Sequence, residues 1–336
     1  GDRRPEASQM SDRTHSPKVR NGRPLVIAHR GASGYLPEHT QEAKALAYAM
    51  GADFLEQDVV VSRDDVLVVS HDIHLDRVSD VVTRFPDRRR DDGRFYVRDF
   101  DLAELKMLNI HERLNDDASG PAFPGRFPVG HGEFRIVTLA QEIELVQGLN
   151  RSTGRNVGIY PEIKAPAWHR QEGVDVAALL LEMLAQYGYE SKQDAVFVQC
   201  FDAQELKRLR QDLDCRLRLI QLVGENSWAE SATDYNRMRT TQGLSELARV
   251  ADGIGPWIDQ LYTLAEIDGQ PVSSGLVRMA HEAGLQVHPY TFRADAVPQG
   301  FDSYHELVCW FVYELRIDGL FTDFTDLTLD ILRRSR

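Results

Sequence analysis

Short apolar runs rich in β-branched residues alternate along the chain with stretches in which apolar residues recur at helical spacing. This alternation is typical of a parallel β-sheet whose strands are joined by crossover helices. The chain is therefore expected to have an α/β fold. The runs that predict strands are residues 25–28, 54–61, 66–70, 157–160, 196–199, 217–222, 253–255, 285–289 and 319–321.

The segment 41–50 shows how the pattern predicts a helix. Thr40 is a good N-cap because its hydroxyl can accept a hydrogen bond from a backbone N–H of the first turn. Gly51 supplies a C-terminal stop, since glycine readily adopts the left-handed conformation that ends many helices. One face of the segment is apolar and carries Ala43, Leu46, Ala47 and Met50. With the strands on either side, the segment predicts a β-helix-β unit.

Two segments depart from the regular alternation. Residues 59–69 predict two strands joined only by residues 62–65, which leaves no room for a crossover helix and gives one strand too many for a regular eight-stranded barrel. Residues 76–135 are dense in charge, proline and glycine, with one helical piece near 102–108. We expect them to form an insertion after the third strand, a small subdomain over one end of the fold. Within it, the alternating charges of residues 84–94 predict a solvated loop.

Length, composition and charge narrow the class of protein. The 336 residues suit one large domain, expected over residues 24–336, because α/β barrels often use this length for a single core. Hydrophobic residues make up 42% of the chain, enough for a sizeable core. The formal net charge of −13 repels nucleic acid and anionic membrane surfaces, so neither is expected as a partner. No apolar run reaches the length of a membrane span.

The first residues and the cysteines add two smaller expectations. Residues 1–23 are polar and rich in Arg, Pro and Ser, without the apolar stretch of a signal peptide, and predict a disordered, solvated tail. Cys200, Cys215 and Cys309 have no C-x-x-C spacing, so they predict neither a zinc site nor a disulfide framework. The sequence gives no indication of the oligomeric state.

Ionisable residues gather where several predicted strands end. In α/β barrels the reactive groups lie at this carboxyl-terminal edge. Taken singly, a histidine or carboxylate after a strand is more often structural than catalytic. A common site is the better interpretation here because four strands share the feature, contributing His29-Arg30-Gly31, Glu56-Gln57-Asp58, His71-Asp72 and Glu162-Ile163-Lys164.

Three of these carboxylates are candidate metal ligands. Glu56 and Asp58 lie two residues apart and therefore project from the same face of a strand. Buried carboxylates repel each other and lose their solvation, and a cation relieves both costs. Glu162 would complete a set of three oxygen ligands, which suits Ca²⁺ or Mg²⁺ better than Zn²⁺. The alternative is that Glu162 forms an ion pair with Lys164, which shares its face of the strand.

The histidines and the basic residues supply the other requirements of phosphodiester cleavage. Such a reaction needs a base for the nucleophile and an acid for the leaving alkoxide, and His29 and His71 are the candidates. Arg30 offers a planar fork of donors to phosphate oxygens, and Lys164 adds a movable point charge. The sequence leaves open which histidine is the base, and whether water or a hydroxyl of the substrate is the nucleophile.

Taken together, the motifs resemble the glycerophosphodiester phosphodiesterases, in particular their bacterial periplasmic branch, over residues 24–332. The matching motifs are His29-Arg30-Gly31, Pro37-Glu38-His39-Thr40, Glu56-Gln57-Asp58, Val68-Val69-Ser70-His71-Asp72, Glu162-Ile163-Lys164 and Thr322-Asp323. The resemblance implies a distorted TIM barrel, (β/α)8, with a small insertion after the third strand. It also implies hydrolysis of glycerophosphocholine, glycerophosphoethanolamine and similar small molecules to sn-glycerol 3-phosphate and an alcohol.

The same resemblance implies roles for individual residues. His29 and His71 would be the acid/base pair. The metal would be calcium, with Mg²⁺ as the alternative, held by Glu56, Asp58 and Glu162. The substrate-binding residues would be Arg30 and Lys164 at the phosphate, Glu38 within its matched motif, and Phe201 and Tyr290 as candidates to line a glycerol pocket.

Some positions depart from the family pattern, and two other functions stay open. His288-Pro289-Tyr290-Thr291 stands where many relatives have Trp-Thr-Val-Asn, which leaves the specificity for the alcohol undecided. A phospholipase D- or C-like activity is disfavoured because the sequence has no Trp-rich or basic membrane loop. A surface binding protein that retains the barrel is disfavoured by the intact set of candidate catalytic residues. The resemblance alone implies a periplasmic or secreted location.

Overall fold

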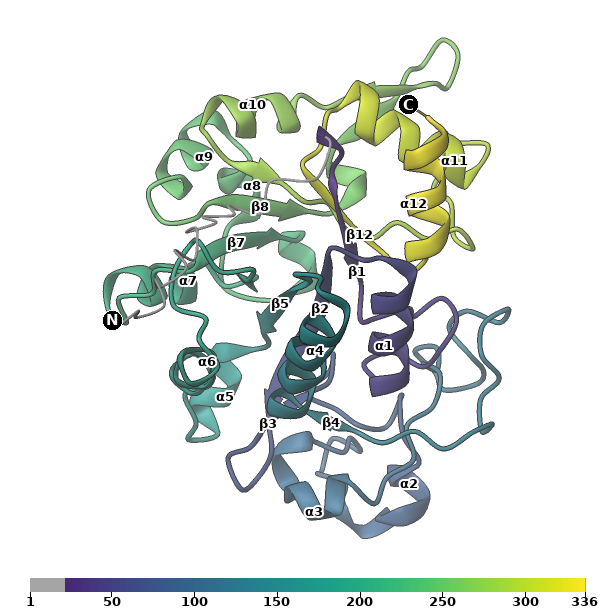
Figure 1. Cartoon of the computed structure of the whole chain (residues 1–336), viewed down its shortest axis with the longest axis vertical. Coiled ribbons are helices and arrows are strands. Elements are labelled where there is room, and N and C mark those ends of the chain that lie inside the picture. The colour runs from purple at the N-terminus through teal and green to yellow at the C-terminus, as the bar shows by residue number, and fades with distance from the viewer. Residues whose placement is uncertain (1–21, 336) are drawn as a thin grey trace, which may run out of the picture.

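The computed structural model describes residues 22–335, in which eight parallel strands form a closed barrel at the centre of the molecule (Figure 1). Along the sheet the strands follow the order β11-β8-β7-β6-β5-β2-β1-β12. The two ends of the sheet meet through Asp318 N, 3.0 Å from Val287 O, and Phe321 N, 3.1 Å from Pro289 O. The predicted TIM barrel is confirmed. Its strands are β1 (Leu25–Ala28), β2 (Phe54–Val61), β5 (Gly158–Ile163), β6 (Phe197–Cys200), β7 (Arg218–Val223), β8 (Gly253–Pro256), β11 (Gln286–Val287) and β12 (Gly319–Thr322).

The surplus predicted strand lies outside the barrel. β3 (Leu67–Val69) pairs antiparallel with the end of β2, and β4 (Val137–Thr138) pairs antiparallel with β3. The connection from β2 to β3 is a tight turn in which Asp65 N donates to Ser62 O at 3.1 Å. A hairpin needs no crossover helix, so this short link does not interrupt the eight parallel strands.

Helices surround the barrel (Figure 1). α1 (Gln41–Met50) begins and ends as predicted, because the Thr40 side chain accepts from Ala43 N and Gly51 takes a φ of 107°. Its apolar face packs toward α12 and β2. The other helices around the barrel are α4 (Leu139–Thr153), α5 (Pro166–Gln171), α6 (Val176–Gln186), α7 (Ala203–Gln211), α8 (Tyr235–Met238), α9 (Thr241–Leu247), α10 (Leu276–Glu282), α11 (Tyr304–Cys309) and α12 (Thr325–Arg334).

Three short strands were not predicted from the sequence. They are β4 and an antiparallel hairpin formed by β9 (Tyr262–Leu264) and β10 (Pro271–Ser273). The hairpin is largely exposed, so it carries none of the continuous apolar pattern that marks the barrel strands. In the part of the chain that the structure describes, no helix combines the length and the apolar character needed to cross a bilayer.

The alternation of side chains along the strands separates the closed base of the barrel from its reactive end. Aromatic and aliphatic residues from six strands fill the base. In five of these strands the next inward position toward the carboxyl end is polar, and in β7 it is Leu222. In β2, for example, Phe54 lies in the base and Glu56 and Asp58 follow on the same face. The base comprises Leu25, Ile27, Phe54, Tyr160, Phe197, Ile220 and Phe321.

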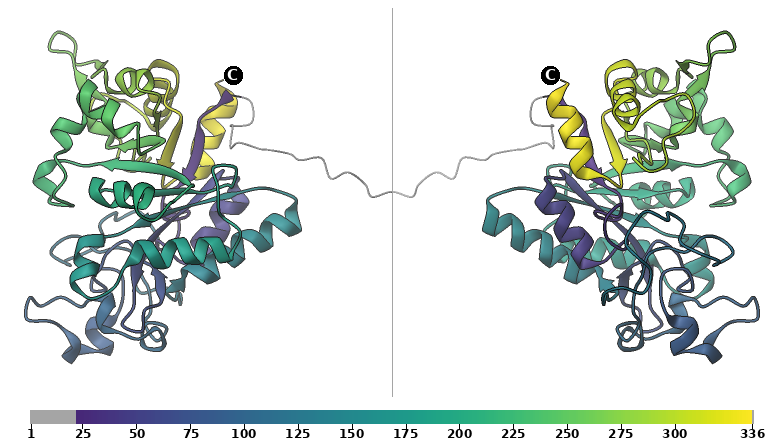
Figure 2. Two further views of the ribbon diagram at one scale, coloured as in Figure 1. Left: turned by 90° about the vertical axis from the view of Figure 1, so that its left-hand side faces the viewer. Right: turned by 90° about the vertical axis from the view of Figure 1, so that its right-hand side faces the viewer.

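The segment between β3 and β4 forms a separate layer with its own apolar cluster (Figure 2). It contains α2 (Val81–Arg84), α3 (Leu102–Leu105) and two 3₁₀ turns, so the helical piece expected near 102–108 is shorter than predicted. It contacts the loop around α5 through Tyr96, which stacks on Trp168 with ring centroids 5.5 Å apart. The apolar cluster of this segment comprises Val60, Val68, Leu75, Val81, Phe95, Val97, Phe100, Leu105, Leu108, Ile110, Phe134 and Ile136.

The tail expected at 1–23 lies almost wholly outside the described residues.

Candidate active site

A cavity of about 400 Å³ lies at the carboxyl-terminal end of the barrel, with most of the predicted site residues in its wall. Two predicted residues, Glu38 and Lys164, are buried beside the site but are not part of this wall. The cavity brings together side chains that are up to 292 positions apart in the sequence, from His29 to Phe321. The predicted residues in the wall are His29, Arg30, Glu56, Asp58, His71, Glu162, Phe201 and Tyr290.

The three predicted metal ligands form a buried acidic cluster. Asp58 and Glu162 are direct partners in the β2/β5 register, and Glu56 lies one inward position before Asp58. Burial raises the pKa of Glu56 well above its usual value, and the charges of Asp58 and Glu162 raise it further. Asp58 Oδ1 is buried without a hydrogen-bond partner among the described residues. Mutual repulsion together with a buried oxygen that lacks a hydrogen-bond partner is the environment that a divalent cation stabilises, so Glu56 and Asp58 fit one. Glu162 lies outside the group of donor atoms that come within 4.8 Å of one another.

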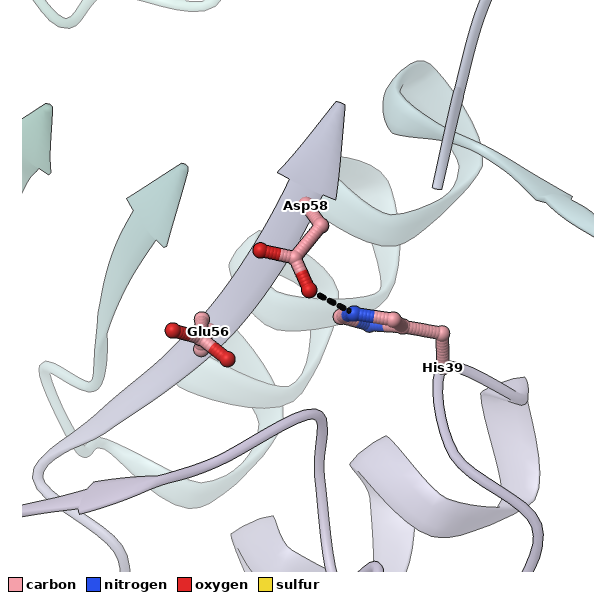
Figure 3. A group of neighbouring side chains, drawn as sticks. All are labelled: His39, Glu56 and Asp58. Carbon is pink, nitrogen blue, oxygen red and sulfur yellow. Dashed lines mark hydrogen bonds and ion pairs between the residues drawn. The ribbon is translucent and has the colours of Figure 1, made fainter. Parts of the chain in front are cut away.

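A histidine that was not predicted as a site residue joins this cluster (Figure 3). His39 Nε2 lies 2.5 Å from Asp58 Oδ2, and donor atoms of His39, Glu56 and Asp58 all lie within 4.8 Å of one another. His39 Nδ1 is buried and has no hydrogen-bond partner within residues 22–335. His39 thus orients Asp58 and places an imidazole nitrogen beside the candidate cation site.

The alternative proposed for Glu162 is also present in the structure. Lys164 Nζ lies 3.1 Å from Glu162 Oε2. Burial nevertheless raises the pKa of Glu162 to about 8, although Lys164 opposes the shift. A carboxylate has two oxygens, so a contact between Lys164 and one oxygen leaves the other able to bind a cation. The ion pair and the metal site are therefore compatible.

Each predicted catalytic histidine forms a pair with an aspartate. His29 Nδ1 lies 2.6 Å from Asp323 Oδ1, and His71 Nδ1 lies 2.6 Å from Asp72 Oδ1. Because the aspartate occupies Nδ1, the pairing favours the Nδ1–H tautomer and leaves Nε2 with a lone pair. Burial lowers the pKa of His29 to about 4 and that of His71 to about 3. Both imidazoles are neutral at pH 7 and can accept a proton.

Arg30 has a buried guanidinium nitrogen that forms no hydrogen bond. Its Nη1 donates to Glu38 at 3.1 and 3.2 Å, whereas its Nε has no hydrogen-bond partner in the described chain and lies 3.9 Å from Asp58 Oδ2. Arg30 has a φ of 61°, and the following Gly31 has a φ of 89°, where a Cβ would lie 2.8 Å from the backbone of Ala43. The turn after β1 therefore requires glycine, which explains the His-Arg-Gly motif.

Glu38 lies behind Arg30 instead of in the cavity wall. Both of its oxygens accept hydrogen bonds from two arginines, Arg30 and Arg113. These charges hold the pKa of Glu38 well below its usual value despite its burial. A carboxylate with both oxygens occupied is placed to orient Arg30, so the structure does not bring the predicted substrate-binding Glu38 into the cavity.

The wall formed by the loops after β6, β7, β8 and β11 is aromatic and acidic. The rings of Phe201 and Tyr290 meet at 6.0 Å, and those of Trp228 and Trp257 meet edge to face at 5.0 Å. Tyr290 is fixed by a hydrogen bond from its hydroxyl to Val223 O at 2.8 Å. The wall also contains two carboxylates that form no hydrogen bond or ion pair within residues 22–335, Glu230 and Asp259.

Comparison with known proteins identifies the family of this chain and several of its relatives. A family model described as the glycerophosphoryl diester phosphodiesterase family matches residues 29–327. The chain belongs to this family. A glycerophosphodiester phosphodiesterase of Haemophilus influenzae is 41% identical over 92% of this chain and 90% of its own length. One of Treponema pallidum is 37% identical over 92% of this chain and 91% of its own length.

Solved structures of the family share the fold. A putative glycerophosphoryl diester phosphodiesterase of Silicibacter pomeroyi has a TM-score of 0.68 at 23% identity, covering 94% of this chain and 95% of its own. A phosphodiesterase of Oleispira antarctica, solved with the product sn-glycerol-3-phosphate, has a TM-score of 0.61 at 21% identity, covering 93% and 97%. As a member of this family, the chain is an enzyme of the glycerophosphodiester phosphodiesterase class.

Against this family background, several functional candidates escaped the sequence analysis. Asp323 stood in the matched Thr322-Asp323 motif, but no role was derived for it because its partner His29 is 294 positions away. Gln199 holds Glu56 through a hydrogen bond of 2.9 Å. Arg113, which contacts Asp72, and Arg126, which contacts Asp323, lie in the charge-rich insertion, where nothing in the spacing separates them from solvated arginines. His39 stood in the matched Pro37-Glu38-His39-Thr40 motif, but no role was derived for it.

Proposed function

We propose that the protein hydrolyses glycerophosphodiesters to sn-glycerol 3-phosphate and an alcohol with the help of a divalent cation. The observation that carries the proposal is one cavity that joins three buried carboxylates, two His–Asp pairs and Arg30, whose Nε forms no hydrogen bond within residues 22–335. The related phosphodiesterase of Oleispira antarctica was solved with sn-glycerol-3-phosphate, which supports the same product here.

The proposed cation ligands are Glu56, Asp58 and Glu162. Donor atoms of Glu56 and Asp58 lie within 4.8 Å of one another together with one of His39, and Glu162 is the register partner of Asp58. Three buried carboxylates favour a hard ion, and we propose Ca²⁺, with Mg²⁺ as the alternative. When bound, the ion supplies Lewis acidity that stabilises negative charge on phosphate oxygens. It would also offset the mutual repulsion that raises the pKa of Glu56.

The remaining chemistry belongs to side chains of this chain. Arg30 Nε donates to a non-bridging phosphate oxygen, which orients the phosphodiester in the cavity. Nε2 of one histidine accepts the proton of the attacking hydroxyl, and the other histidine protonates the departing alkoxide. The negative charge of bound substrate raises the pKa of a neighbouring imidazole, which favours the protonated form that the leaving group needs.

The aromatic and acidic wall supports a preference for substrates with a cationic alcohol, such as glycerophosphocholine and glycerophosphoethanolamine. Faces of Trp228 and Trp257 attract a quaternary ammonium through cation–π interactions, worth about 0.5–2 kcal/mol each. Glu230 and Asp259 add negative charge, and neither forms a hydrogen bond or an ion-pair contact within residues 22–335. The cavity thus has Arg30 in one part of its wall and acidic aromatic surface in another.

The direct test is release of sn-glycerol 3-phosphate from glycerophosphocholine in a coupled assay. Wild-type protein should turn over, EDTA should abolish the activity, and Ca²⁺ should restore it. Absence of turnover with glycerophosphocholine, glycerophosphoethanolamine and glycerophosphoglycerol would favour a binding protein that retains the barrel. Cleavage of phosphatidylcholine vesicles in preference to these soluble diesters would favour a phospholipase-like enzyme.

Export is a separate proposal. A periplasmic or secreted location was expected from the resemblance to the bacterial periplasmic branch, and cell fractionation of the producing organism tests it. Recovery of the protein in the periplasmic or extracellular fraction supports the location. Recovery in the cytoplasmic fraction alone contradicts it and leaves the proposed hydrolysis unaffected.

A further inference from the structure

Each His–Asp pair is contacted by an arginine from the insertion between β3 and β4. Arg126 Nη2 lies 2.9 Å from Asp323 Oδ2, and Arg113 Nη1 lies 2.8 Å from Asp72 Oδ2. In both pairs the other aspartate oxygen, Oδ1, lies 2.6 Å from the histidine Nδ1. The same set of contacts, from an arginine to an aspartate and from the aspartate to a histidine, therefore occurs twice, with the two histidines at the ends of different strands. We call each set an Arg–Asp–His relay.

The surroundings of these arginines suit a positioning role. The Arg126 side chain is 5% exposed, lies 3.9 Å from the centroid of the Phe123 ring, and also donates to Ser33 O and to both oxygens of Asp295. Arg113 binds both oxygens of Glu38 at 2.7 and 3.0 Å. Neither arginine is part of the cavity wall. Their donors are occupied by protein groups, so they act through the aspartates instead of on the substrate.

We propose that the insertion is a positioning element of the active site, in which Arg126 holds Asp323 and Arg113 holds Asp72 so that both histidines keep the Nδ1–H tautomer. The proposal rests on the proposed function, in which both histidines react through Nε2. An aspartate bound by imidazole at one oxygen and by guanidinium at the other has one favoured orientation. Docking of the insertion thus completes both catalytic pairs at once.

The two aspartates differ in the number of arginines that donate to them. This difference predicts unequal effects when Arg113 and Arg126 are each removed. Asp323 Oδ2 also accepts a hydrogen bond of 2.8 Å from Arg293 Nε. Arg293 lies in the barrel loop after β11. Asp72 Oδ2 has Arg113 as its one side-chain donor among residues 22–335. Loss of Arg113 should therefore impair catalysis more than loss of Arg126.

Steady-state kinetics with glycerophosphocholine tests this order. For Arg113→Met we expect kcat to fall about 10–100-fold, the range seen when partners of reactive groups are removed. Arg126→Met should lower kcat less, and the Lys variants should lie between Met and wild type. Arg90→Met is the matched control, because Arg90 joins the insertion to Glu172 of the barrel and contacts neither pair. It should keep kcat within about twofold.

A double-mutant cycle separates positioning from general loss of structure. If Arg113 acts through Asp72, then Asp72→Asn should lower kcat and Arg113→Met should add little to that loss. Additive losses of kcat in the double variant would overturn the proposal. Thermal unfolding followed by circular dichroism confirms that every variant is folded.

Nuclear magnetic resonance of the free protein gives a readout that needs no turnover. The Nδ1–H protons of His29 and His71 should resonate far downfield in wild type, and Arg113→Met should shift or broaden the His71 signal alone. An unmoved His71 signal would overturn the proposal. If wild type hydrolyses no glycerophosphodiester but the signal moves, the positioning role stands and the proposed function fails.

Discussion

Asp58 and Glu162 stand directly opposite each other in the register of β2 and β5, both buried at the reactive end of the barrel. Parallel pairing in this register leaves two carboxylates with little water and with each other as neighbours. If positions 58 and 162 had only a structural role, apolar residues would be expected there, as at Phe54 in the barrel base. The pair is therefore best explained by a ligand that neutralises it.

Removal of either histidine should impair catalysis without unfolding the protein. For His29→Ala and His71→Ala we expect kcat to fall by about 10²–10⁴, the usual contribution of general acid or base catalysis. The measurement is the coupled assay for sn-glycerol 3-phosphate with glycerophosphocholine. His131→Ala is the control, because His131 is an exposed residue of the insertion. Nearly full activity in His29→Ala or His71→Ala would remove that residue from the mechanism.

Affinity for the cation should increase with pH. Burial raises the pKa of Glu162 to about 8, so this carboxyl group holds a proton near neutrality in the metal-free protein, and burial also raises the pKa of Glu56 well above its usual value. A cation binds the ionised form, so affinity rises as pH increases through about 8 and is lost as pH falls below it.

Isothermal titration calorimetry of Ca²⁺ at pH 6, 7, 8 and 9 checks this dependence. Repeating the titration in buffers of different ionisation enthalpy measures the protons released on binding. Glu162→Gln should weaken binding and reduce proton release. Affinity that is constant across this range would rule out proton competition at the carboxylates.

The aromatic wall should determine the preference among alcohols. We expect Trp257→Leu and Glu230→Gln each to lower kcat/KM for glycerophosphocholine about three- to tenfold, because a cation–π contact or a screened charge contributes about 1 kcal/mol. The value for glycerophosphoglycerol, whose alcohol is neutral, should change less than twofold. Equal losses on both substrates would show that the wall supports the cavity without selecting cationic alcohols.

A buried ion pair behind the metal site offers a test of stability. Lys44 of α1 and Glu142 of α4 are both fully buried and form an ion pair with each other. Lys44→Met alone leaves an unpaired buried carboxylate and should cost about 3–5 kcal/mol of unfolding free energy. Lys44→Met with Glu142→Leu should recover most of that loss. Urea unfolding measures both, and a double variant no more stable than the single one would contradict the account.

The sequence predicts those parts of the fold that depend on local patterns. The barrel strands and α1 follow from apolar runs, from the Thr40 cap and from Gly51, and they lie within a few residues of the predicted bounds. The hairpin β9–β10 escapes because exposed strands carry no continuous apolar run. The insertion is visible only as a composition change, and its short helices depend on packing against β2 and β3.

For the site, the sequence identifies reactive groups but not their partners. Strand ends bring His29, Glu56 and Asp58 together because every parallel strand ends at the same edge. The contacts of Arg126 with Asp323 and of His39 with Asp58 join loops whose mutual approach no local pattern encodes. Glu38 was assigned to the substrate by its motif, whereas its oxygens are occupied by arginines.

We propose that Glu56, Asp58 and Glu162 bind one cation that glycerophosphodiester hydrolysis requires. The most direct measurement is sn-glycerol 3-phosphate release from glycerophosphocholine by metal-stripped protein titrated with Ca²⁺, for wild type and Asp58→Asn. The account predicts no activity in stripped wild type, saturation as one ion binds, and at least about a 100-fold lower kcat/KM in Asp58→Asn at the same Ca²⁺. Full activity of stripped wild type with EDTA present would contradict it.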